Sequence, residues 1–162
     1  MRGLVLPAAV RDGIAAHAAA TWPEEACGIL IGPAAAGPAD LRVERSLACA
    51  NIAPADERRR RFEIDPRAVI ETQRRLRDTG SGILGFYHSH PDAAALPSPT
   101  DLPFFRLWPH TVWLILEVRD GRTTAAPRAW WLEPDADSPV EMPVHAAAGD
   151  IAGITRKPGV DA

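Results

Sequence analysis

The sequence GILGFYHSHPDAAALPSPTD occupies residues 82–101. Its apolar and aromatic segment 83–87 predicts a short buried strand. His88 and His90 follow that segment directly. Alternate side chains of a strand point to the same face, so the two imidazoles should project together. Asp101 comes after a proline-rich loop that is long enough to turn back toward them. These three side chains therefore form a candidate metal site.

The ligand set of two histidines and one aspartate suits one Zn²⁺ ion per chain, with a water molecule in the fourth tetrahedral position. A structural zinc site normally closes all four positions, usually with cysteine, so an open site indicates catalysis. Zinc lowers the pKa of its bound water from about 15.7 to about 7 and so produces a nucleophile at neutral pH. A His-x-His pair often arises by chance, but Asp101 at this spacing and the preceding strand favour a metal site.

The composition is that of one ordinary domain. The chain has 162 residues and a net charge of −3 without a dominant basic face, which argues against nucleic-acid binding. No apolar run approaches the length of about 18 residues that a membrane helix needs, and the first ten residues do not resemble a signal peptide. Cys27 and Cys49 form no CxxC motif, which favours a reducing compartment. We therefore expect a soluble, cytoplasmic protein that binds neither nucleic acid nor membrane.

Four consecutive arginines, Arg58–Arg61, follow Asp56 and Glu57. The run is consistent with a solvated loop or strand edge, which is the usual place for such charges. It is also consistent with a docking patch for an acidic partner. The sequence leaves both interpretations open.

Apolar periodicity and turn residues predict strands that alternate with helices and also form hairpins. Asp65 followed by Pro66 marks a clear helix start, with Asp65 as the N-cap. Because crossovers and hairpins both occur, the sheet should be mixed. The segment 146–162 has glycine, proline and charges without periodicity, and we expect a flexible tail there. Strands are expected at 4–6, 27–32, 41–50, 62–64, 83–87, 111–118, 125–133 and 140–145, and helices at 8–20 and 67–78.

Several motifs together resemble the signature of the JAMM (MPN-plus) zinc metallopeptidase family, in its short prokaryotic JAB-like form. The HSHP sequence at 88–91 is followed by Asp101, with Pro-Ser at 97–98 shortly before it, and the EACG sequence at 25–28 resembles the family's upstream acidic element. The resemblance covers residues 1–145. It implies a single JAB/MPN domain with an α/β fold, in which a mixed, curved β-sheet is flanked by helices, as in the cytidine-deaminase-like architecture.

The resemblance also implies roles for individual residues. His88, His90 and Asp101 would bind the zinc ion. Glu25 would hold the zinc-bound water and act as a general base, and later as an acid toward the leaving amine. Ser98 would donate a hydrogen bond to the oxyanion of the tetrahedral intermediate.

Two of these assignments have alternatives. Glu24 is adjacent to Glu25, and only the match to the family element favours Glu25. Ser98 lies in a Ser-Pro-Thr-Asp sequence, which is also typical of a plain turn or a helix cap.

The family hydrolyses amide or isopeptide bonds after the C-terminal glycine of ubiquitin or a ubiquitin-like protein. Its short prokaryotic members resemble enzymes that process sulfur-carrier proteins. The chain has no room for the long insertions of eukaryotic deubiquitinases. The resemblance therefore implies that a small carrier with a Gly-Gly C-terminus binds across the cleft as an added strand. No oligomeric state is indicated.

Two other classes of protein remain open. A non-catalytic scaffold of the same fold is possible, although such members have usually lost metal ligands and this chain retains them all. Another zinc hydrolase, such as a deaminase, is disfavoured because its H-x-E and P-C-x-x-C elements are absent. The HEXXH motif of another protease class is absent as well.

Overall fold

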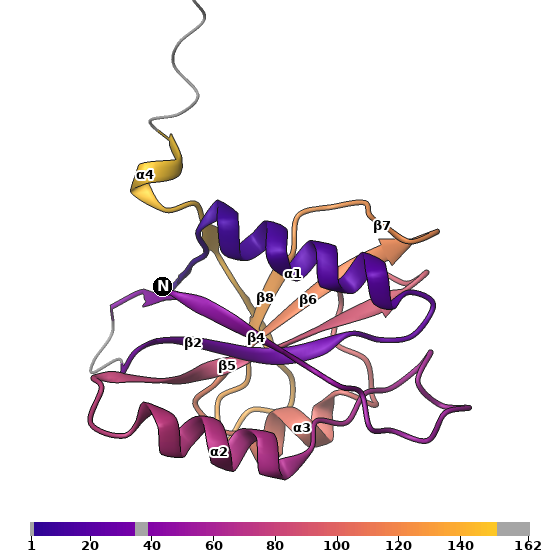
Figure 1. The fold of residues 1–162 in the computed structure, drawn as a ribbon, viewed down its shortest axis with the longest axis horizontal. Coiled ribbons are helices and arrows are strands. Elements are labelled where there is room, and N and C mark those ends of the chain that lie inside the picture. The colour runs from indigo at the N-terminus through magenta and orange to yellow at the C-terminus, as the bar shows by residue number, and fades with distance from the viewer. Residues whose placement is uncertain (1, 35–38, 152–162) are drawn as a thin grey trace, which may run out of the picture.

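The computed structural model describes residues 2–34 and 39–151. Strands and helices alternate along the chain and build a mixed α/β fold (Figure 1). This architecture confirms the predicted fold class, a mixed sheet flanked by helices. Among the described residues, no helix is long and apolar enough to cross a membrane.

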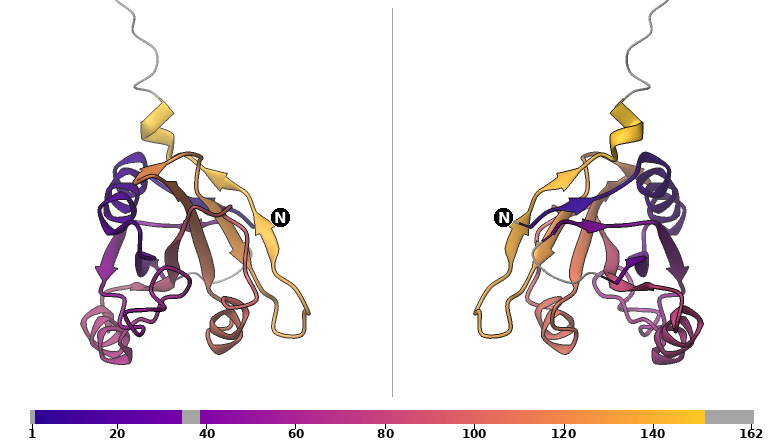
Figure 2. Two further views of the ribbon diagram at one scale, coloured as in Figure 1. Left: turned by 90° about the vertical axis from the view of Figure 1, so that its right-hand side faces the viewer. Right: turned by 90° about the vertical axis from the view of Figure 1, so that its left-hand side faces the viewer.

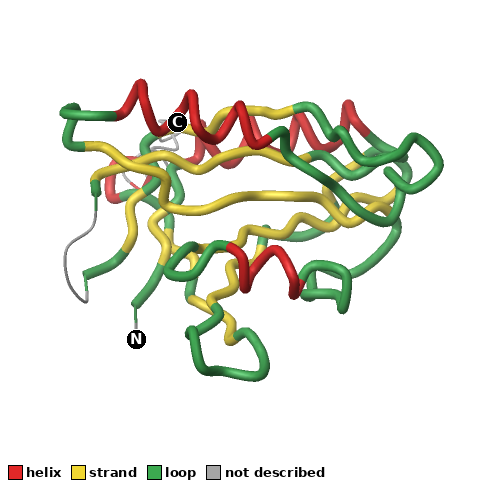
Figure 3. Tube along the Cα trace, turned by 90° about the horizontal axis from the view of Figure 1, so that it is seen from below, coloured by secondary structure: helices red, strands yellow, loops and turns green. Residues whose placement is uncertain are grey.

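Among the residues that the structure describes, the main sheet has seven strands, which run side by side through the centre of the molecule (Figure 3). The strand order is β4-β2-β5-β6-β8-β9, and β7 pairs with β6. Within the described part of this sheet, only the β5–β6 pair is parallel, because the chain crosses over between these strands through helix α3 (Leu102–Leu107). The strands are β2 (Cys27–Pro33), β4 (Arg45–Cys49), β5 (Ser81–Pro91), β6 (Val112–Arg119), β7 (Arg122–Thr123), β8 (Arg128–Trp131) and β9 (Val140–Met142).

Helices cover both faces of this sheet. Helix α1 (Ala8–Thr21) lies on one face, and helices α2 (Pro66–Leu76) and α3 (Leu102–Leu107) lie on the other (Figures 1 and 2). The side chains of β6 alternate accordingly: Leu114 belongs to the cluster on the α1 side, and Trp113 to the cluster on the α2 and α3 side. Both faces of β6 are therefore buried, and nearly its whole length is apolar.

A small second sheet has the order β10-β1-β3 and consists of β1 (Leu4–Val5), β3 (Leu41–Arg42) and β10 (Val144–His145). Its existence corrects the prediction of single strands at 41–50 and 140–145. Within 41–50, the chain changes the strand with which it pairs: Val43 N donates to Val5 O, whereas Glu44 N donates to Ile31 O. Within 140–145, Pro143 has no N–H for a sheet ladder, and its carbonyl accepts from Leu4.

The predicted strand at 62–64 is wrong. This segment lies in a loop, and its backbone bonds to the segment around Asn51: Ile52 N donates to Glu63 O, and Glu63 N donates to the Asn51 side chain. The helix start that follows is confirmed, because the Asp65 carboxylate accepts a hydrogen bond from Arg67 N at the first turn of α2.

The beginning of the predicted tail contains a short helix, α4 (Ala148–Ile151). Asp150 Oδ2 accepts a hydrogen bond of 2.8 Å from Ala8 N, the first residue of α1. Pro7, at the N-cap position of α1, has no side-chain hydrogen-bond acceptor, and Asp150 supplies one from the other end of the chain. Residues 152–162 lie outside the described part of the chain, and the domain boundary at 145 stays a prediction.

Candidate metal and catalytic centre

The centre is built at the carboxyl end of β5, where His88 and His90 point to the sheet face that α2 and α3 cover. His88 is fully buried and His90 nearly so. The Phe62 ring stacks on the His88 ring, with centroids 4.5 Å apart and an angle of 24° between the planes. The period of two along the strand therefore directs both imidazoles into one buried site, as the sequence predicted.

Three metal-ligating side chains converge there. His88 Nε2 lies 3.1 Å from His90 Nε2 and 3.2 Å from Asp101 Oδ1, and His90 Nε2 lies 3.3 Å from Asp101 Oδ2. Ligands about 2.0–2.1 Å from a zinc ion in tetrahedral geometry are about 3.3 Å apart. The group is therefore able to hold a metal ion of this size.

His90 is held in the tautomer that metal binding requires. Its Nδ1 lies 2.7 Å from Ala94 O, and a carbonyl only accepts, so Nδ1 carries the proton. The lone pair is then on Nε2, which faces His88 and Asp101. A backbone carbonyl of this kind commonly orients metal-binding histidines.

Asp101 is held in place by Ser98. The backbone N of Ser98 donates to Asp101 Oδ2 at 2.7 Å, and Ser98 Oγ donates to the same oxygen at 2.8 Å. Burial would raise the pKa of the Asp101 carboxyl, but its contacts with His88, His90 and Ser98 hold that pKa well below its usual range. Asp101 is therefore ionised and available as a ligand.

Glu25 reaches the centre through the pairing of β2 with β5. Ser89 N donates to Ala26 O at 3.0 Å, and Ala26 N donates to Ser89 Oγ at 2.8 Å. This register continues one residue further and brings Glu25 opposite His90. The Glu25 side chain is 4% exposed, whereas Glu24 is half-buried.

The Glu25 carboxylate lacks the hydrogen bonds that buried charges normally have. Within the described residues, its Oε2 has no hydrogen-bond partner. Burial raises the pKa of Glu25 to about 8, with His90 opposing that shift and Asp101 adding to it. The structure thus brings all five predicted site residues together: His88, His90, Asp101, Glu25 and Ser98.

Asn51 belongs to the same centre, although the sequence analysis gave it no role. Its Nδ2 donates to Glu25 O at 3.1 Å and to Arg61 O at 3.0 Å. Its Oδ1 accepts from Ala53 N and Glu63 N, both at 3.1 Å. An asparagine that bonds the backbone two residues ahead is a recognisable turn signal, but the links to Glu25 and Arg61 depend on the tertiary fold.

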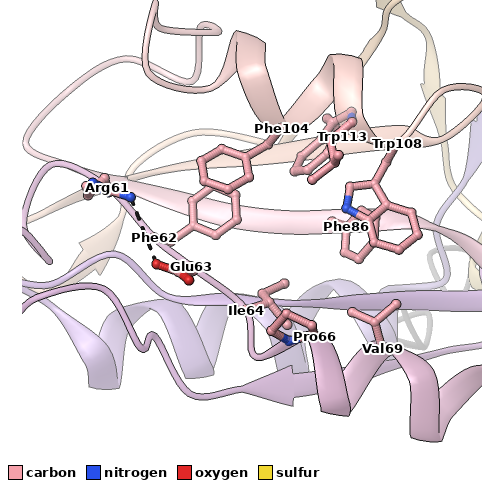
Figure 4. Close-up of a pocket in the computed structure, with 11 residues that line it drawn as sticks. Arg61, Phe62, Glu63, Ile64, Pro66, Val69, Phe86, Phe104, Trp108 and Trp113 are labelled. Carbon is pink, nitrogen blue, oxygen red and sulfur yellow. Dashed lines mark ion pairs between the residues drawn. The ribbon is translucent and has the colours of Figure 1, made fainter.

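An apolar pocket of about 520 Å³ adjoins the centre (Figure 4). It lies between the loop at 61–64, α2 and α3. Phe62 connects it to the centre, because its ring stacks on His88 and also on Phe104, with centroids 5.1 Å apart in the second pair. The remaining lining residues include Val69, Phe86, Leu107, Trp108 and Trp113.

Comparison with known protein families places the chain in a family. The model for prokaryotic homologs of the JAB domain matches residues 7–133. The chain belongs to this family. The matched range contains Glu25, Ser98 and the three side chains that could hold a metal ion. The predicted family membership, as a short prokaryotic JAMM-type protein, is therefore confirmed.

Among characterised JAB relatives, the desampylase of Haloferax volcanii is 38% identical over 127 residues, which is 75% of this chain and 85% of the relative. A probable TtuB-protein conjugate cleaving protease of Thermus thermophilus is 32% identical over 102 residues, or 62% of this chain and 63% of the relative. The CysO-cysteine peptidase of Mycobacterium tuberculosis is 31% identical over 99 residues, which is 61% of this chain and 63% of the relative. The predicted enzyme class, a JAMM-type peptidase, is thereby confirmed.

Solved structures show the same JAB-type architecture. A protein of Desulfitobacterium hafniense superimposes with a TM-score of 0.72 at 26% identity, and covers 89% of this chain and 92% of its own. A protein of Salinibacter ruber superimposes with a TM-score of 0.66 at 31% identity, and the match covers 90% of this chain and 92% of that protein.

Proposed function

We propose that this JAB-family chain is a zinc peptidase that hydrolyses the amide bond after the C-terminal Gly-Gly of a ubiquitin-like or sulfur-carrier protein. One observation carries the proposal: three metal-ligating side chains converge beside the buried Glu25 carboxylate, whose Oε2 has no partner among the described residues. The names of the relatives support the substrate class, since they include a conjugate-cleaving protease and a CysO-cysteine peptidase.

His88 Nε2, His90 Nε2 and an Asp101 oxygen would hold the zinc ion. Their separations of 3.1, 3.2 and 3.3 Å suit tetrahedral zinc, and the donor set leaves one coordination position open. When bound there, zinc would supply a Lewis acid and lower the pKa of a water molecule to about 7. Nitrogen and carboxylate ligands without cysteine suit a catalytic rather than a structural zinc ion.

Glu25 is the general base in this proposal. Its unpartnered Oε2 takes a proton from the attacking water and later delivers it to the nitrogen of the leaving amine. Burial favours the protonated form of Glu25, as the raised pKa of about 8 indicates, so proton uptake and release are both accessible near neutral pH.

Ser98 has two roles in the proposal. Its single hydroxyl proton is donated to Asp101 Oδ2, which orients that ligand. To stabilise the oxyanion, the hydroxyl turns toward the substrate carbonyl, while Ser98 N keeps its own hydrogen bond to Asp101. The serine therefore orients the ligand in the resting state and donates to the substrate during the reaction.

The carrier tail binds in an extended form along the cleft beside His88. An apolar side chain upstream of the two glycines enters the pocket between α2 and α3 and packs against Phe62 and Phe104. The enzyme then selects the peptide by the side chain in the pocket, and the bond to be hydrolysed lies at the metal. The cytoplasm stays the predicted location.

The test uses protein loaded with one equivalent of zinc and two probes, the CysO and TtuB carriers, each extended at its C-terminal glycine by a reporter peptide. Mass spectrometry identifies the product. Release of a carrier that ends at glycine supports the proposal. Stoichiometric zinc without cleavage of either probe contradicts it, and carrier binding without cleavage would instead indicate a non-catalytic scaffold.

A further inference from the structure

The run of four arginines, Arg58–Arg61, lies against the segment just before β2 that contains Glu25. Glu25 N donates to Arg58 O at 2.7 Å. The run therefore forms part of the wall of the catalytic centre, at the end of the sheet where β5 terminates (Figure 1). The run lies in a turn in which Arg59 and Arg60 are exposed, as the solvated-loop interpretation expects, and its position beside Glu25 also fits a docking patch.

The turn that carries the arginines is internally bonded. Glu57 N donates to Pro54 O, and both Arg60 N and Arg61 N donate to Glu57 O, at 2.9, 2.9 and 3.1 Å. Arg58 Nε donates to Ala53 O at 2.7 Å. A backbone held in this way presents its side chains from defined positions, which lowers the conformational entropy lost when a partner binds.

The four side chains divide into two pairs. Arg58 bonds to the turn itself, and Arg61 forms ion pairs with Glu57 at 2.8 Å and Glu63 at 3.9 Å. Arg59 and Arg60 are exposed and form no ion pair within the described residues. Asp56 lies in the same turn and is the exposed acidic residue closest to these two arginines in the sequence. Two unpaired positive charges therefore face solvent, although the whole chain has a net charge of −3.

Two exposed apolar side chains lie near the arginine turn and the pocket. Ile52, just before the turn, is 43% exposed, and Leu107, which lines the pocket, is 68% exposed. Figure 4 shows Arg61 and Glu63 beside Phe62 at one end of that pocket. A surface that combines apolar contacts with a few positive charges is typical of a protein interface, whereas nucleic-acid binding relies on many phosphate contacts.

We infer that Arg59 and Arg60 dock an acidic face on the folded body of the carrier protein, while its tail reaches the metal centre. The inference rests on the proposed function and assigns the turn to substrate selection. Charges at the rim of an interface mainly act on association, so they should affect KM and its salt dependence rather than kcat.

The experiment compares two substrates of the zinc enzyme: whichever reporter-extended carrier the wild-type protein cleaves, and a peptide of about ten residues with only its tail and the same reporter. The test variant is Arg59→Glu with Arg60→Glu. The conservative variant is Arg59→Lys with Arg60→Lys. The matched control is Arg74→Glu with Arg77→Glu, the same charge change at exposed positions near the other end of α2.

For the test variant, we expect kcat/KM on the whole carrier to fall about tenfold at low salt, through KM. The difference should shrink at about 0.5 M salt, where the Debye length is only about 4 Å. Cleavage of the tail peptide should be unchanged, and the lysine variant and the control should behave like the wild type.

Four results would overturn the inference. Equal kcat/KM on the whole carrier would remove the docking role, and an equal loss on the tail peptide would indicate damage to the Glu25 region. Salt-sensitive RNA binding that the test variant loses, with no effect on the carrier, would assign the arginines to nucleic acid. If the wild-type protein cleaves neither substrate, the proposed function fails first and the inference with it.

Discussion

Cys27 of β2 lies directly opposite His88 of β5 in the antiparallel pair. Side chains alternate along both strands, so Glu25 and His90, each two residues away, are also neighbours on one face. The distance between the acidic residue and the metal ligands is thus set by strand register. A slip of one residue would turn Glu25 to the opposite face of the sheet, so the centre depends on this register.

Replacement of Glu25 by glutamine should leave zinc binding intact and lower kcat by about 10²- to 10⁴-fold, because the amide accepts no proton. Zinc content by mass spectrometry and cleavage of a carrier fusion measure both effects. Glu24→Gln is the matched control, since Glu24 is half-buried and should be dispensable. If Glu24→Gln lost activity instead, the assignment of the base would be wrong.

His88→Ala should abolish stoichiometric zinc binding and activity together, because two ligands remain at most. In the wild-type protein, zinc should raise Tm, since a ligand that binds only the folded state stabilises it. Thermal unfolding with and without zinc checks this.

His110→Asn is the control for that histidine change. His110 is exposed and has a φ of 63°, a conformation that asparagine tolerates. The zinc-dependent rise in Tm of the His110→Asn variant should equal that of the wild type. A zinc-dependent rise that survives in His88→Ala would contradict the metal site.

Ser98→Ala should weaken zinc binding about tenfold, because Asp101 Oδ2 loses one of its two hydrogen bonds from Ser98. At saturating zinc, kcat should still fall about 100-fold through the loss of the oxyanion donor. Zinc titration and saturating-zinc kinetics separate these effects. Full recovery of kcat at high zinc would limit Ser98 to orienting Asp101.

Metal-free protein should lose stability as the pH rises from about 4.5 to about 8. Burial raises the Glu25 pKa to about 8, so in this window the folded state holds a proton that the unfolded chain releases. The stabilising effect is complete below the unfolded pKa and is lost as the pH passes through the folded one. Urea unfolding at several pH values should show a shallower slope for Glu25→Gln. Equal slopes for the variant and the wild type would mean that Glu25 of the folded protein is ionised throughout this pH range.

Asn51→Ala should lower the free energy of unfolding by about 2–4 kcal/mol, because the backbone groups that its side chain bonds lose their partner. Hydrogen exchange at the amides of Ala53 and Glu63 should also become faster. Gln73→Ala, which removes an exposed amide from α2, should change neither quantity. Unchanged exchange in Asn51→Ala would show that the loop is held by other contacts.

The convergence of His88, His90 and Asp101 could be predicted from the sequence because their geometry is local. His88 and His90 share one strand, where the period of two determines direction, and Asp101 follows within one proline-rich turn. The main helices and strands likewise follow from apolar periodicity. The strands at 41–50 and 140–145 were predicted as single units because periodicity does not reveal where a strand changes partner.

The remaining features depend on contacts between distant segments. The burial of Glu25 rather than Glu24, the four hydrogen bonds of Asn51 and the bond from Glu25 to the arginine turn all join residues whose proximity no local pattern encodes. Hydrogen bonding and packing select these partners only when the sheet is assembled, since each backbone group that becomes buried then needs a partner. Local pattern thus specified the ligands, and tertiary packing decided what surrounds them.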